Sequence, residues 1–177
     1  MKQRVSQRVR TCFDQLIKSR FGNMSLCKSG QLRKGDLLYH FDVGNRPSRY
    51  LHLQLHTSED WFTIDVGWSE KGRYPGHLVG LAFPVSVPAL GICASEPIDG
   101  ELRFRIGFLW PPYQDYWWRL DQEHTTELPP EAHLDMILAG QEVPDAGDLL
   151  ISERVADALD RVSNYVVPYF ESLRQSS

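Results

Sequence analysis

The sequence predicts an α+β fold in which an antiparallel sheet of about five strands carries an N-terminal and a C-terminal helix on one face. Three observations support it. Apolar residues recur at helical spacing near both ends of the chain, while several middle segments alternate apolar and polar residues. A pair of tryptophans, Trp117 and Trp118, closes the last alternating segment. The 177 residues fit one domain, which we assign to residues 1–177.

The first predicted elements are a helix and a meander of three strands. The helix is indicated by an apolar stripe that starts at Val5 and continues to Ile17, and Gly22-Asn23 is a plausible end for it. The alternating segments that follow are short and separated by turn residues, which is typical of antiparallel strands. These strands are predicted at residues 37–43, 51–56 and 61–68.

Residues 69–100 form an irregular excursion rich in proline and glycine. Four prolines and five glycines in this segment argue against a regular central strand. A structureless connection of that length is unusual, so we expect a short helix or edge strand within residues 78–83 or near residues 91–94.

The second half of the chain is predicted to add two strands and two helices. A strand at residues 102–108 is joined through a Pro111-Pro112 turn to the strand that bears the paired tryptophans. A short helical piece is expected at 126–138 and a loop at 141–148. The last helix is expected at 152–173, with Ser152 as its N-cap and Pro168 as the site of a kink or local break.

Alternation assigns side chains to the two faces of the sheet. Adjacent strand residues point to opposite faces, so we expect Trp118 in the core and Trp117 on the other face. The residues expected beneath the helices are Tyr39, Phe41, Leu53, Leu55, Phe62, Ile64, Val66, Phe104, Ile106, Phe108 and Trp118.

The opposite face carries the candidate binding residues. They are His40, Asp42, His52, Gln54, His56, Asp65, Arg103, Arg105, Trp117 and Arg119, with Thr63 among them. Imidazole, carboxylate, guanidinium and indole groups together can bind an anion or a polar partner. An antiparallel sheet also often leaves one polar face in water, so a merely solvated face remains an open alternative.

Several chemistries are disfavoured. His52 and His56 lie about 13 Å apart along one strand, too far to hold one ion by themselves, and three cysteines are too few for a disulfide framework or a zinc site. A nucleophile elbow is missing, so we assign no catalytic residue, and we expect no metal and no cofactor. Without a secretory signal or an apolar run of about 20 residues, we expect a cytoplasmic protein with no membrane partner.

Charge is distributed unevenly along a chain of net charge −4. Residues 1–36 carry nine Lys or Arg and two Asp, whereas residues 121–177 carry twelve carboxylates and three Arg. One interpretation is that these oppositely charged segments lie close together in the fold. The other is a basic patch for nucleic acid or an acidic patch for a basic partner.

The order of elements resembles a bacterial domain-of-unknown-function family, the four-three-zero-four series. The resemblance rests on Phe62-Thr-Ile-Asp-Val-Gly67, Arg105-Ile-Gly107 and Asp115-Tyr-Trp-Trp118, and covers residues 10–172. Asp65 stands where the family has Asn, and residues 69–100 have no counterpart. The family has no established activity, catalytic residue or cofactor, so the resemblance implies the fold and leaves the function open.

Two functional hypotheses follow. The first is a non-enzymatic, adaptor- or immunity-like module whose polar sheet face, around Arg103, Arg105 and Trp117, binds another protein. The second is a ligand-binding protein or enzyme that uses His40, Asp42, His52 and Asp65 in a cleft roofed by residues 69–100. Nucleic-acid binding through the basic N-terminal segment ranks last, because few aromatic residues accompany those cations.

Overall fold

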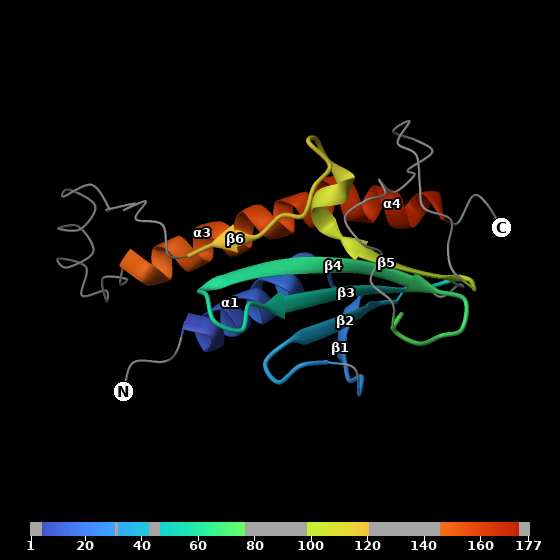
Figure 1. Ribbon diagram of the computed structural model, residues 1–177, viewed down its shortest axis with the longest axis horizontal. Helices are drawn as coiled ribbons and strands as arrows, with labels where there is room; N and C mark the ends of the chain where they lie inside the picture. Colours follow the sequence, from blue (N-terminus) through green and yellow to red (C-terminus); the bar gives the residue numbers. More distant parts are fainter. Residues whose placement is uncertain (1–4, 31, 43–46, 77–98, 121–145, 174–177) are drawn as a thin grey trace.

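A computed structural model describes residues 5–30, 32–42, 47–76, 99–120 and 146–173. It confirms the α+β class: an antiparallel sheet carries α1 and the C-terminal helices on one face (Figure 1). The predicted elements at residues 78–83, 91–94 and 126–138 lie outside the described residues. Among the described helices, none combines the length and the apolar character needed to cross a membrane.

The described sheet has six strands in which every pairing is antiparallel, with the order β1-β2-β3-β4-β5 and with β6 also on β4. Its strands are β1 (Met24–Cys27), β2 (Leu37–Phe41), β3 (Ser48–Leu55), β4 (Trp61–Ser69), β5 (Glu101–Arg105) and β6 (Trp118–Arg119). The predicted meander is confirmed as β2, β3 and β4. Strand β1 was not predicted, because four residues at a sheet edge with an exposed Leu26 carry little alternation.

Strands β5 and β6 follow one another along the same edge of β4. Residues 101–105 pair with 65–69, and residues 118–119 pair with 61–62. The two predicted strands are present as β5 and β6, but a 3₁₀ helix, η2 (Ile106–Leu109), lies between them. The predicted extension of the first strand through Phe108 is therefore wrong, and so is its direct connection to the second strand across the Pro-Pro turn. All four residues of η2 are buried, a continuous apolar run that a half-exposed strand would not show.

The segment between β5 and β6, residues 106–117, folds back on itself at Gly107. A Cβ atom at this position would lie 2.3 Å from the carbonyl oxygen of Gln114, so only glycine allows the two limbs to approach this closely. Thr63 Oγ1 donates a hydrogen bond of 2.7 Å to the Tyr116 carbonyl, which connects this segment to β4.

The C-terminal helical region begins earlier than predicted and changes its winding before Pro168. It comprises α3 (Ala146–Arg161), a π-helical turn η3 (Val162–Val166) and α4 (Val167–Ser172). The predicted N-cap Ser152 therefore lies inside α3, and residues 146–148 are helix rather than loop. Pro168 stands in the first turn of α4, where its missing N–H is tolerated, and the π turn before it confirms a local break.

Helix α1 (Val5–Arg20) runs parallel to α3 along the core face (Figure 1). Arg8 Nε donates to Asp148 at 2.5 Å near one end, and Arg20 Nη1 donates to Asp160 at 2.5 Å near the other. These two ion pairs join the basic N-terminal and the acidic C-terminal segments. The interpretation that these segments lie close together in the fold is confirmed for the described residues.

The predicted core is confirmed, with Leu55 half-buried at its margin. Phe13 and Ile17 of α1 and Leu159 of α3 are buried against the sheet residues that alternation assigned to this face. The pleat therefore sends His52 and Asp65 to the opposite face, where the candidate site lies.

Candidate functional site

The opposite face of the sheet is filled by buried polar residues and is not simply solvated. His52 is 3% exposed, Gln54 7%, Asp65 0% and Arg105 9%. Antiparallel register places His52 directly opposite Asp65 on one side, and Arg105 opposite Asp65 on the other. Charged groups at this depth need partners, because an unpaired buried charge is strongly unfavourable.

Asp65 is the centre of this network. Its Oδ1 accepts a hydrogen bond from Arg105 Nη1 at 2.6 Å. Its Oδ2 accepts two from Arg103, at 2.6 Å from Nη2 and 3.0 Å from Nε. Arg105 Nη1 also donates to the side-chain oxygen of Gln54. Both carboxylate oxygens are therefore held by guanidinium groups, in charge-assisted bonds that are stronger than neutral ones.

His52 bridges Asp65 and Asp36. Its Nε2 lies 3.1 Å from Asp36 Oδ2, and its Nδ1 lies 3.3 Å from Asp65 Oδ2 and 2.9 Å from the Tyr74 hydroxyl. The other oxygen of Asp36 accepts the backbone N–H of Leu55 at 3.1 Å. Neither ring nitrogen of His52 is left to accept a proton from a substrate.

The same contacts shift two pKa values in opposite directions. Burial by itself would lower the pKa of His52, but its hydrogen bonds to Asp36 and Asp65 outweigh burial and raise that pKa above 6.5. Burial would raise the pKa of Asp65, but the hydrogen bond from His52 and the charges of Arg105 and Arg103 bring that pKa below 3.8. Both shifts favour the charged forms, an imidazolium at His52 and a carboxylate at Asp65, and this supports a structural role over proton transfer.

A pH dependence of stability follows from the raised pKa of His52. Its stabilising contribution is fully present below pH 6.5, the value for an unfolded chain, and is lost as the pH rises through the higher folded pKa. We expect wild type to lose more unfolding free energy than His52→Gln between about pH 6 and about pH 9 in urea titrations. An equal loss in both proteins would contradict a charged His52.

Beside the network lies a row of aromatic rings and guanidinium groups in contact, which we call the aromatic–arginine row. It consists of Arg105, Trp117, His56, Trp61 and Arg119. Successive groups along this row are 4.9, 5.3, 5.4 and 4.6 Å apart, measured to ring centroids. Asp115 fixes one end, because it accepts from Trp117 Nε1 at 3.1 Å and pairs with Arg105 Nε at 3.4 Å.

The predicted site residues thus fall into two connected groups and two outliers. The network and the row bring together His52, Gln54, Asp65, Arg103, Arg105, His56, Trp117 and Arg119. His40 instead packs on Tyr50, with ring centroids 5.3 Å apart, and Asp42 is exposed past the end of β2. Sequence reasoning missed Asp36 and Tyr74, which precede and follow the alternating strands and gave no period-2 signal.

Nucleophilic and metal chemistry gain no support from the described residues. Burial raises the pKa of the thiols of Cys12 and Cys27, which makes both poor nucleophiles. Among the described residues, the His, Cys, Asp and Glu side chains form no group of three or more that could hold a metal ion.

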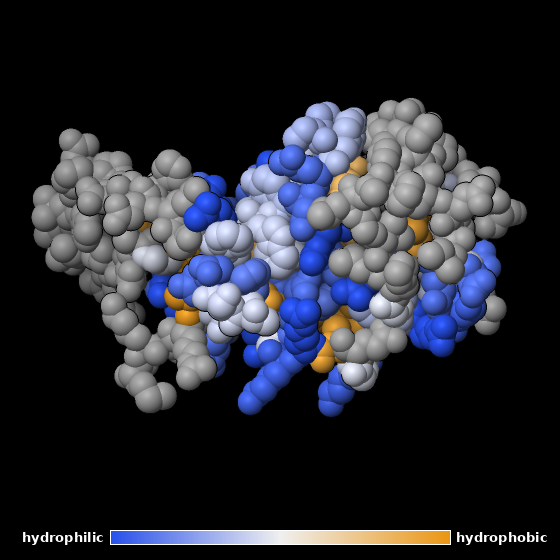
Figure 2. Space-filling view, in the orientation of Figure 1, coloured by the Kyte–Doolittle hydropathy of each residue, from blue (hydrophilic) through white to orange (hydrophobic). Residues whose placement is uncertain are grey.

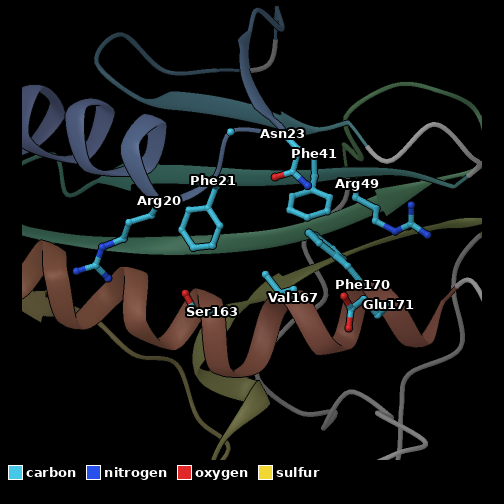
Figure 3. A pocket seen from close by; sticks show the side chains of 10 residues that line it. Arg20, Phe21, Asn23, Phe41, Arg49, Ser163, Val167, Phe170 and Glu171 are labelled. Carbon is cyan, nitrogen blue, oxygen red and sulfur yellow. The ribbon is translucent and has the colours of Figure 1, made fainter.

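A cavity of about 450 Å³ opens on the other side of the sheet, between the turn after α1 and the start of α4. Phe21, Phe41 and Phe170 line it, with Arg20 and Arg49 at its two ends (Figure 3). Figure 3 shows the two guanidinium groups pointing away from the rings in opposite directions, and Arg20 is paired with Asp160. Small-molecule sites need polar groups that converge on the ligand, so this cavity is a weak candidate.

No family model matches this chain, and comparisons with curated proteins and with solved structures also gave no match. The resemblance to the four-three-zero-four series therefore stays a prediction.

Proposed function

We propose that this protein is a non-enzymatic interaction module of the cytoplasm that binds another protein through the aromatic–arginine row. The observation that carries the proposal is that the groups of the buried polar network are hydrogen-bonded to one another. Both oxygens of Asp65 and both ring nitrogens of His52 are engaged within the fold. The network thereby supports the row beside it, in which Trp117 is half-buried and Arg119 is exposed.

The row has the composition and the rigidity of a binding hot spot. Tryptophan and arginine are the residues most enriched where truncation to alanine costs the most binding energy. Trp117 is half-buried and is held by Asp115, His56 and Arg105, so it loses little conformational freedom when a partner covers it. A preorganised indole of this kind supports a contact role.

The surrounding surface favours a polar partner. Hydrophilic residues dominate the described surface seen in Figure 2, with only small hydrophobic spots. Among the described residues, Leu26 and Tyr113 are the large hydrophobic side chains that are exposed. Obligate interfaces are more apolar than this, so we infer a contact that forms and dissociates.

The alternative, a ligand-binding protein or enzyme using His40, Asp42, His52 and Asp65, receives less support. His40 packs on Tyr50 instead, and Asp42 is exposed past the end of β2. Tyr74 packs against His52 with ring centroids 5.5 Å apart, which closes that part of the face.

The proposal is tested by identifying a partner and measuring its affinity with matched variants. A protein captured from the native host should bind purified wild type, and Trp117→Ala should weaken that binding about tenfold or more. Arg119→Glu provides a second variant of the row. Tyr113→Ala is the control, because it removes an exposed aromatic ring that does not belong to the row.

Arg105 is unsuitable for this test because its charge supports Asp65, and its loss would disturb folding. Unchanged melting temperatures of Trp117→Ala and Tyr113→Ala establish that both variants fold. Equal affinity of these two variants for the captured protein would overturn the proposal, as would a failure to capture any protein that binds directly.

A further inference from the structure

We propose that a cleft between α1, the β1–β2 connection and the end of β3 binds a small phosphorylated ligand. The cleft measures about 540 Å³ and is lined by Arg10, Arg33, Lys34, His56, Ser6 and Thr57 among others. We call it the cationic cleft. This ligand site goes beyond the proposed protein contact, with which it shares His56.

The charge of the cleft is the first argument. Within the described part of the chain, Arg10, Arg33 and Lys34 have no carboxylate within ion-pair distance. Most other described arginines do: Arg8, Arg20, Arg73, Arg103, Arg105 and Arg161 each contact an aspartate or a glutamate. Three uncompensated cations around one concavity repel one another, and a bound anion relieves that repulsion.

The one carboxylate in the lining does not neutralise these cations. Asp36 is bound through Oδ2 to His52 and through Oδ1 to the backbone N–H of Leu55. Its side chain is only 3% exposed, so its charge is directed into the buried network rather than into the cleft. The cleft is therefore positive in a protein whose net charge is −4.

Further hydrogen-bond donors complete the lining. His56 accepts the backbone N–H of Glu59 at Nδ1, at 3.0 Å, which leaves Nε2 as the ring nitrogen that can donate. Ser6 and Gln7 lie in the first turn of α1, which contains no acidic residue, at the positive end of the helix dipole. Thr57, an exposed residue, also lines the cleft and offers a hydroxyl group.

Size and polarity point to a compact polyanion. The volume lies within the range of about 300–1,000 Å³ that small-molecule sites occupy. Leu55 is the apolar side chain among the lining residues, so a hydrophobic ligand would find little contact area. Phosphoryl groups carry concentrated charge and several acceptor oxygens, which matches a set of arginine, lysine, amide and hydroxyl donors.

Pyrophosphate is the probe, titrated into the full chain by calorimetry at low ionic strength. We expect saturable binding that weakens as salt is added, and a loss of about tenfold or more in affinity for Arg33→Ala/Lys34→Ala. Lys28→Ala/Lys71→Ala is the matched control, because it removes the same charge from exposed positions outside the cleft. This control should bind as wild type does after correction for net charge.

The same samples give an independent readout by nuclear magnetic resonance. At the same pyrophosphate concentration, the ring signals of His56 should shift in wild type and in the control, and should shift much less in Arg33→Ala/Lys34→Ala. Equal affinity in the two double variants would show unspecific charge attraction and overturn the proposal. Citrate binding as tightly as pyrophosphate would overturn the assignment to phosphoryl groups, and binding of neither anion would overturn the site.

Discussion

Asp65→Asn should lower the free energy of unfolding by about 3–5 kcal/mol, the usual cost of removing one partner from a buried ion pair. Asp65 is fully buried, and its carboxylate is the shared counter-charge of Arg103 and Arg105. Asparagine keeps the shape of the side chain but removes the charge. Two guanidinium groups and the His52 ring would then face each other without an anion between them.

Urea denaturation followed by circular dichroism measures this effect, with Asp60→Asn as the matched control. Asp60 is exposed at the turn between β3 and β4, so the same chemical change there should alter stability by less than about 0.5 kcal/mol. A loss below about 1 kcal/mol in Asp65→Asn would contradict the central role of this carboxylate.

A double-mutant cycle sharpens the result. Arg103→Ala removes one of the cations that Asp65 neutralises, so its effect should be smaller in the Asp65→Asn background than in wild type. Additive losses would mean that the two side chains act independently. That result would contradict the direct ion pair, in which Arg103 Nη2 lies 2.6 Å from Asp65 Oδ2.

Alternation alone predicted which residues share the polar face, since the side chains of a strand repeat every two residues. It predicted Trp118 in the core, and that side chain is 1% exposed. It did not predict strand register, and register is what places Asp65 between His52 and Arg105. The composition of the face was therefore readable from the sequence, whereas the network was not.

The sequence also did not predict that the polar face of the sheet is buried. Asp36 reaches His52 from the residue before β2, and Tyr74 reaches it from beyond β4. Neither belongs to an alternating segment, so no periodicity links them to the sheet. For the same reason the cationic cleft was missed: Arg10, Arg33 and His56 come from a helix, a connection and a strand end that only the fold brings together.

Trp118→Ala should be the second large effect, at about 3–5 kcal/mol of unfolding free energy. The indole stacks on Phe62 with ring centroids 5.2 Å apart, and Tyr116 meets it edge-on at 5.0 Å. Its Nε1 donates to Asp157 of α3 at 2.7 Å. Strand β6 has two residues, so its backbone pairing with β4 is short. The Trp118 side chain therefore contributes more than this pairing does to holding the sheet edge against the C-terminal helix.

The neighbouring tryptophan supplies the internal control. Trp117→Ala deletes the same side chain one position away, but from a half-exposed site, so it should destabilise the fold much less than Trp118→Ala while weakening partner binding. Trp118→Phe keeps the stacking on Phe62 and loses the hydrogen bond to Asp157, so it should fall between wild type and Trp118→Ala. Equal losses at positions 117 and 118 would mean that the row is part of the core, and the assignment of Trp117 to a contact surface would then fail.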